Sequence, residues 1–129
     1  MATWRSVALT DVGMKRENNE DSFLVNEDLG LYVVCDGMGG HAGGETASRL
    51  AVQTIERELI SARLRPDDPF ASKALLAESP LAGALREAVE GACAAVYRTS
   101  KMNPELHGMG TTCISLLVRG EHEIGRAHV

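Results

Sequence analysis

A short apolar run, residues 31–35, leads directly into Asp36 and then into a stretch, Gly37 to Gly44, in which five of eight residues are glycine. The run is typical of a β-strand. Glycine permits positive φ values and lets the backbone approach a neighbour or a ligand closely. The chain therefore has to turn sharply just after a strand, and the carboxylate of Asp36 lies at that turn. This placement predicts a metal or phosphate site.

Length and charge restrict the class of protein. A chain of 129 residues with 44% hydrophobic residues is long enough for one core and too short for two ordinary domains. The net charge is −5 and no run of Lys or Arg is present, so nucleic acid is not an expected partner. No apolar stretch is long enough for a membrane helix, and residues 1–5 do not resemble a secretory signal. We therefore expect a cytoplasmic protein that does not bind membranes.

The three cysteines are widely spaced, and each lies in an apolar segment. Cys35, Cys93 and Cys113 are therefore expected to be reduced core thiols and to form neither a disulfide framework nor a zinc site.

The strand pattern predicts a hairpin near the start of the chain. Residues 23–25 and 31–35 flank a short loop that ends in glycine, and their pairing would bring Glu20 and Asp21 beside Asp36. Two further strands are expected, at residues 4–10 and 111–118, and Arg119-Gly120 follows the second as a turn.

Two helices are expected between these strands. Apolar residues recur at helical spacing from Glu45 to about Leu64. Ser79 and Pro80 have the pattern of an N-cap and a first helical residue, and a second apolar stripe follows them. Residues 70–78 are compatible with a short helix or with an irregular connection. Blocks of strands and helices favour an α+β fold with helices on an antiparallel sheet, and the sheet looks incomplete.

The acids near the hairpin suit divalent cations. Carboxylate oxygens are hard ligands for Mg²⁺ or Mn²⁺, and Asp36 could bridge two ions about 3.5 to 4 Å apart. The carbonyl of Gly37 could supply a further oxygen, and Glu20 and Asp21 could complete the metal ligands. Arg16 could hold a substrate phosphate through two parallel hydrogen bonds. This set predicts phosphate chemistry on metal ions.

These residues also fit other patterns. Asp36 could be an ordinary turn residue, and Arg16 could pair with Glu20 on the surface. Residues 39–46 approach a P-loop, but Glu45 occupies the position of its lysine and would repel phosphate. Residues 37–42 fit a dinucleotide fingerprint, but no acid ends a second strand about 20 residues later.

Three ordered motifs resemble one family, the metal-dependent serine/threonine protein phosphatases of the protein phosphatase 2C type, in their bacterial form. The resemblance runs from Trp4 to about Glu121. Its motifs are Thr10-Asp11-Val12-Gly13 with Arg16, Asn19, Glu20 and Asp21; Asp36-Gly37-Met38-Gly39-Gly40-His41 with Gly44 and Glu45; and Gly108-Met109-Gly110-Thr111-Thr112.

The resemblance implies a four-layer α/β/β/α sandwich with antiparallel sheets, of which this chain would be the N-terminal part. It also implies hydrolysis of phosphoserine and phosphothreonine by a metal-bound hydroxide with two Mn²⁺ or Mg²⁺ ions. Arg16 would bind phosphate, and Glu20, Asp21, Asp36 and Gly37 would hold metal. The substrates would be phosphorylated proteins, the products of bacterial Ser/Thr kinases, and we expect a monomer.

One position in these motifs departs from the family pattern, and the roles of a few nearby residues stay open. Some members carry a histidine directly after the aspartate-glycine pair, where this chain has Met38, which cannot transfer a proton. His41 is the nearest substitute as a catalytic proton donor, although it could equally hydrogen-bond the glycine-rich turn. His107 is expected at the surface. Thr111 and Thr112 are expected to be strand residues. As an alternative, one of their hydroxyls could contact metal-bound water.

The C-terminal region departs further. The family continues with a glycine-aspartate-serine-arginine strand and later aspartates, which this sequence lacks. We therefore expect residues 1–123 to be a partial phosphatase domain that is inactive alone. Residues 124–129 resemble the translation of a sequencing adapter and are predicted to be a non-native tail, although residues 127–129 could instead begin a native strand. A phosphoprotein-binding pseudophosphatase fragment is the alternative function.

Overall fold

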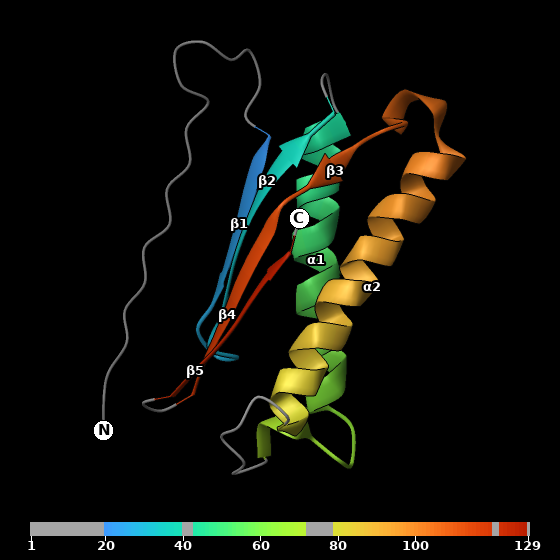
Figure 1. The fold of residues 1–129 in the computed structure, drawn as a ribbon. Helices are drawn as coiled ribbons and strands as arrows, with labels where there is room; N and C mark the ends of the chain where they lie inside the picture. The colour runs from blue at the N-terminus through green and yellow to red at the C-terminus, as the bar shows by residue number, and fades with distance from the viewer. Residues whose placement is uncertain (1–19, 40–42, 72–78, 120–121, 129) are drawn as a thin grey trace.

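The strands are β1 (Asp21–Asn26), β2 (Leu31–Met38), β3 (Gly110–Thr111), β4 (Cys113–Arg119) and β5 (His122–His128), and the long helices are α1 (Gly43–Arg63) and α2 (Pro80–Met102). The computed structural model describes residues 20–39, 43–71, 79–119 and 122–128, with side chains up to residue 118. They form one antiparallel sheet with both helices against one of its faces (Figure 1). The predicted α+β class with an antiparallel sheet is confirmed.

The sheet brings together segments from both ends of the chain. Its strand order is β1-β2-β4-β5, and the short strand β3 pairs with the end of β2. The second sheet of the expected sandwich is not among the described residues, and the strand expected at residues 4–10 lies outside them. The described part therefore has one sheet face that no helix covers.

The hairpin of β1 and β2 is confirmed. Its turn is closed by a hydrogen bond from Gly30 N–H to the Glu27 carbonyl at 3.1 Å and by one from Leu29 N–H to Asn26 Oδ1 at 3.1 Å. Gly30 has a φ of 69°, and a Cβ there would overlap the carbonyl oxygen of Val118. Glycine is thus required where the hairpin turn touches β4.

Helix α1 begins two residues before the expected start and carries its apolar stripe toward the sheet. The stripe residues Ala47, Ala51, Ile55 and Leu59 are buried. None of the described helices combines the length and apolarity needed to cross a membrane.

Helix α2 begins at the cap that the sequence predicts. Ser79 is its N-cap in an extended conformation, and the Ser79 side chain accepts a hydrogen bond from Ala82 N–H at 3.2 Å. Its expected stripe is buried throughout, at Leu81, Leu85, Ala88, Ala92 and Val96. The sequence left the structure of the segment before α2 undecided. Residues Pro69–Ala71 form a 3₁₀ turn there, and residues 72–78 lie outside the described residues.

The strand expected at residues 111–118 is divided into β3 and β4 at Thr112. After the turn expected at Arg119-Gly120, residues His122–His128 form β5, which pairs antiparallel with β4. Any extended segment can pair with a neighbouring strand through its backbone, so the pairing of β5 does not test whether residues 124–129 belong to the native protein. The non-native origin of residues 124–129 therefore stays a prediction.

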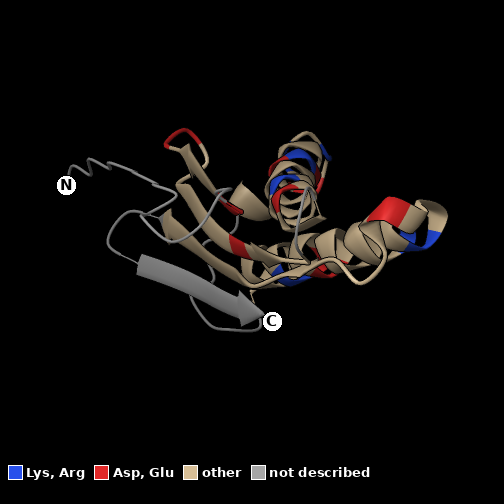
Figure 2. Cartoon of the chain, turned by 90° about the horizontal axis from the view of Figure 1, so that it is seen from above, with Lys and Arg blue, Asp and Glu red and all other residues tan. Residues whose placement is uncertain are grey.

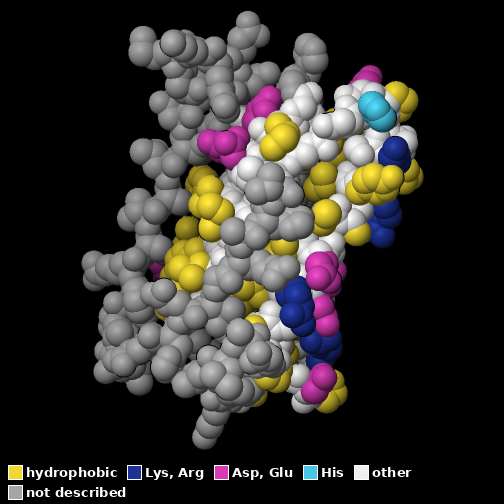
Figure 3. Space-filling view, in the orientation of Figure 1, with side chains coloured by type: hydrophobic (Ala, Val, Ile, Leu, Met, Phe, Trp, Pro, Cys, Tyr) yellow, Lys and Arg dark blue, Asp and Glu magenta, His cyan; other side chains and the backbone are white. Residues whose placement is uncertain are grey.

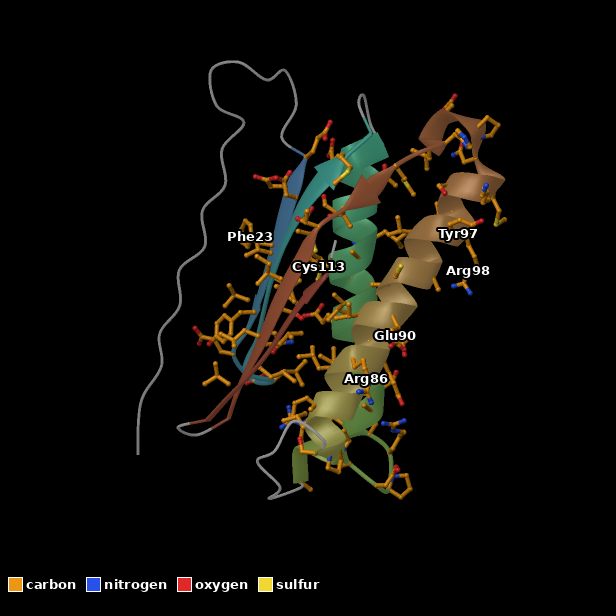
Figure 4. All side chains as sticks on the ribbon, in the orientation of Figure 1. Phe23, Arg86, Glu90, Tyr97, Arg98 and Cys113 are labelled. Atoms are coloured by element: carbon orange, nitrogen blue, oxygen red, sulfur yellow. The ribbon has the colours of Figure 1, made fainter. Side chains whose placement is uncertain are left out.

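The core lies between the sheet and the two helices. Leu31, Val33 and Cys35 on β2 and Leu117 on β4 are almost fully buried, because alternate strand residues face the helices. The other face exposes Phe23, Val34 and Ile114, with Ile114 62% exposed. Figure 4 shows Phe23 projecting from β1 away from the helices, and hydrophobic side chains are also visible at this side in Figure 3.

Two isoleucines of α1 provide a matched test of this packing. Ile55 is 0% exposed, whereas Ile60 on the same helix is 43% exposed. We expect Ile55→Ala to lower the free energy of unfolding by about 2–5 kcal/mol, because it leaves a cavity against the sheet. Ile60→Ala should change it by less than about 1 kcal/mol. Urea unfolding followed by circular dichroism measures both, and equal losses would contradict the described helix orientation.

Candidate metal and phosphate site

Asp21 and Asp36 stand directly opposite each other on β1 and β2. Opposed residues in an antiparallel pair point to the same face of the sheet. Asp36 is exposed, while its neighbours Cys35 and Gly37 are buried toward the helices, so both aspartates belong to the face without helices. The expected approach of Asp21 to Asp36 is confirmed.

This opposition has an energetic cost. Side chains in such a pair have Cβ atoms about 4.5–5.5 Å apart, and like charges there are destabilising. A divalent cation between the two carboxylates would convert that repulsion into attraction. Hard carboxylate oxygens are also what Mn²⁺ and Mg²⁺ prefer, so the donor set fits such an ion. Figure 3 shows Asp and Glu side chains at the end of the sheet where β1 begins and β2 ends.

The side chain of Glu20 points to the face of the sheet that the helices cover. Its carbonyl accepts a hydrogen bond from Gly37 N–H at 3.0 Å, which continues the β1–β2 register by one residue. Its carboxylate lies against Gly44 in the first turn of α1. A negative charge at a helix N-terminus is favourable. The structure thus brings Glu20 beside Gly37 but separates its carboxylate from that of Asp36 by the sheet, and its metal role stays a prediction.

The glycines at the end of β2 are required by packing. A Cβ on Gly37 would overlap the carbonyl oxygen of Gly44, and a Cβ on Gly44 would lie 2.9 Å from the backbone nitrogen of Met38. Gly39 has a φ of 135°, and a Cβ there would lie 2.9 Å from the Cα of Met109. The close approach expected from glycine is therefore an approach to neighbouring protein. The role of the Gly37 carbonyl as a metal ligand stays a prediction.

Thr112, the residue between β3 and β4, holds the backbone of Asp36. Thr112 N–H donates to the Asp36 carbonyl at 2.9 Å, and Asp36 N–H donates to Thr112 Oγ1 at 3.1 Å. The Thr111 hydroxyl donates to the Thr112 carbonyl at 2.7 Å. This arrangement was not predicted from the sequence. The available signal was a pair of adjacent threonines in a predicted strand, because each hydroxyl can replace a backbone hydrogen-bond partner.

Arg16 and His41 lie outside the described residues. Among the described side chains, every Lys and Arg lies on α1, on α2 or in the loop after α1, interspersed with acids (Figure 2). Basic side chains of the described part are therefore absent from the face that carries Asp36. His107 is exposed, as expected, and Met38 is 48% exposed.

The described residues contain no group of three His, Cys, Asp or Glu residues able to hold a metal ion. Asp21 and Asp36 supply two carboxylates. A complete divalent site needs about six oxygen donors, some of them water. Further donors therefore have to come from water or from residues beyond the described part of the chain.

The cysteines are all free, but their surroundings differ. Cys35 and Cys113 are buried, as expected, and the side-chain contact with Cys113 together with burial raises the pKa of the Cys35 thiol. Cys93 is exposed, so its assignment to the core was wrong. It lines an apolar cavity of about 280 Å³, together with Tyr97 on α2 and Met109 before β3.

The sequence profile described as Protein phosphatase 2C matches residues 14–129. The serine/threonine protein phosphatase PstP of Mycobacterium tuberculosis is 38% identical over 125 residues, which are 97% of this chain and 21% of the relative. The serine/threonine phosphatase stp of Listeria monocytogenes is 30% identical over 84% of this chain and 40% of the relative. The chain therefore spans about a fifth to two fifths of the length of these relatives.

Solved structures give the same relationship. The catalytic domain of PstP in complex with two manganese ions has a TM-score of 0.64 and 35% identity, and the match covers 85% of this chain and 41% of that one. The phosphatase MsPP of Mycobacterium smegmatis in complex with cacodylate has a TM-score of 0.68 and 27% identity, over 92% of this chain and 43% of that one.

Two glycines test the packing at this end of the sheet. Gly37→Ala should destabilise the chain by about 1–3 kcal/mol, because the new methyl group overlaps the backbone of Gly44. Gly83 in α2 has no atom within 4 Å of an added Cβ. Gly83→Ala should therefore stabilise the chain by about 0.4–1 kcal/mol. Urea unfolding of both variants measures the difference, and a neutral Gly37→Ala would exclude the described contact.

Proposed function

This chain belongs to the protein phosphatase 2C family, and on that premise we propose that the protein containing it is a serine/threonine protein phosphatase. Its substrates would be phosphoserine and phosphothreonine residues of proteins, the products of Ser/Thr kinases in the bacterial cytoplasm. The observation that carries the proposal is the opposed pair Asp21 and Asp36 on the uncovered face of the sheet. Relatives that are named serine/threonine phosphatases, and a neighbour that holds two manganese ions, support it.

In this proposal Asp36 and Asp21 hold Mn²⁺ or Mg²⁺, with the Gly37 carbonyl as a further donor, while the Glu20 carboxylate lies on the helix side of the sheet. A bound divalent ion lowers the pKa of a water ligand and neutralises negative charge on phosphate. Asp36 lies on a regular strand, so its carboxylate is held in place before substrate arrives. Such preorganisation is what electrostatic catalysis requires.

Two residues outside the described part complete the proposal. Arg16 binds the substrate phosphate through its guanidinium group, in a geometry that suits two parallel hydrogen bonds. His41 donates a proton to the oxygen of the departing serine or threonine, because an imidazole titrates near neutral pH. Met38 at the preceding position has no proton to give.

We also propose that the 129-residue chain is inactive by itself. The family carries further aspartates later in its sequence, which these 129 residues lack, and Asp21 and Asp36 by themselves can attract one ion. A protein that only binds phosphoproteins would need Arg16 and would have no use for the repulsive pair of Asp21 and Asp36. The opposed carboxylates therefore favour the enzyme over the pseudophosphatase.

The test is Asp36→Asn in the protein that contains this chain, with exposed Asp28→Asn in the hairpin turn as the control. We expect Asp36→Asn to lower Mn²⁺-dependent hydrolysis of a phosphothreonine peptide by at least about 100-fold. The Asp28 variant should keep its activity. Release of inorganic phosphate is the measurement.

Thermal unfolding of the same variants provides a second measurement. Mn²⁺ at about 100 times its Kd should stabilise the wild type by about 2.7 kcal/mol and leave Asp36→Asn unchanged. Hydrolysis that proceeds equally well with chelator would refute the metal mechanism. Peptide binding without any turnover in the whole protein would support the pseudophosphatase.

A further inference from the structure

The pairing of β2 with β3 and β4 keeps one register across the break at Thr112. Val34 pairs with Ile114, and Gly37 pairs with Thr111. Counting along both strands places Asp36 opposite Thr112. In a regular antiparallel ladder, alternate opposed residues exchange two backbone hydrogen bonds. Asp36 and Thr112 form such a pair, since Thr112 N–H donates to the Asp36 carbonyl at 2.9 Å.

The second backbone bond of this pair is replaced by side chains. Asp36 N–H donates to Thr112 Oγ1 at 3.1 Å instead of to the Thr112 carbonyl. That carbonyl accepts the Thr111 hydroxyl at 2.7 Å. Thr112 Oγ1 also lies 3.4 Å from the Asp36 carbonyl oxygen, as its donor. The Thr112 side chain thus contacts both polar backbone groups of the residue that faces Asp21.

The replaced hydrogen bond affects the metal site because the carboxylate of Asp36 faces that of Asp21. Repulsion between opposed carboxylates tends to turn the Asp36 side chain and its backbone away from Asp21. Two backbone groups of Asp36 held by one side chain leave less freedom for that rotation. Hydrogen bonds behind a metal ligand commonly orient it, and their loss weakens metal binding by about 10- to 100-fold.

We propose that Thr112 is a positioning residue for the metal site, whose hydroxyl fixes the backbone of Asp36 so that its carboxylate stays aligned with that of Asp21. Thr111 supports it by occupying the Thr112 carbonyl. This inference rests on the proposed metal-dependent function. Thr112 acts through Asp36 and makes no contact with substrate in the proposal.

Three variants separate positioning from general stability. Thr112→Val removes the hydroxyl at nearly constant shape, and Thr112→Ser retains it. Thr54→Val is the matched control, because Thr54 is buried and its hydroxyl donates to the Leu50 carbonyl at 2.7 Å within α1. Thr54→Val therefore reports the cost of losing a threonine hydroxyl elsewhere in the fold.

The first measurement is amide hydrogen exchange at Asp36 by NMR, on this chain without metal. Thr112→Val should speed exchange of the Asp36 amide at least tenfold beyond any change in the global protection of the chain. Thr112→Ser should restore slow exchange, and Thr54→Val should not single out Asp36. Unchanged exchange in Thr112→Val would overturn the proposal, since the hydrogen bond would then not hold this amide.

The second measurement is Mn²⁺ affinity by calorimetric titration of the protein that contains this chain. Thr112→Val should weaken Mn²⁺ binding by about 10- to 100-fold, with recovery in Thr112→Ser and no change in Thr54→Val. The KM for phosphopeptide at saturating Mn²⁺ should stay constant. Equal Mn²⁺ affinity of wild type and Thr112→Val would overturn the role of Thr112 and leave the metal site standing. A wild type that binds no Mn²⁺ would overturn both.

Discussion

The backbone contact between Gly37 and Gly44 is the constraint on which the rest of the site depends. It brings the end of β2 against the first turn of α1 so closely that neither position has room for a side chain. With β2 fixed there, the alternation of the strand points Cys35 into the core and Asp36 to the opposite face. The same contact leaves the carboxylate of Glu20 beside the helix N-terminus, where its charge is favourable.

The opposite face of the sheet carries two carboxylates on opposed residues. Asp21 and Asp36 oppose each other as like charges, on a face that also exposes Phe23 and Val34. Opposed carboxylates held on regular strands are useful when a cation has to be bound in one geometry, and this is the physical link between the sheet and a metal-dependent phosphatase.

Local signals predicted most of the elements. The hairpin followed from two apolar runs around a loop ending in glycine, and α2 followed from Ser79 and Pro80 before an apolar stripe. Two predictions were wrong, at Thr112 and at Cys93, because contacts with residues distant in the sequence determine the structure there. The strand expected at residues 111–118 is broken at Thr112, because its hydroxyl competes with the backbone. Cys93 lies in an apolar segment, yet it lines a cavity beside α2 and is exposed.

The sequence by itself determined that a carboxylate follows a strand into a glycine-rich turn, and that three motifs match one phosphatase family. These are properties of neighbouring residues, and alternation and glycine freedom act over a few positions. The sequence also predicted that the hairpin brings Asp21 beside Asp36. Only the tertiary structure decided that the carboxylate of Glu20 lies against α1, and that Thr112 holds Asp36 from 76 residues away. Those relations depend on how β2 packs against α1 and pairs with β3 and β4, and these elements are distant from β2 in the sequence or are positioned by packing.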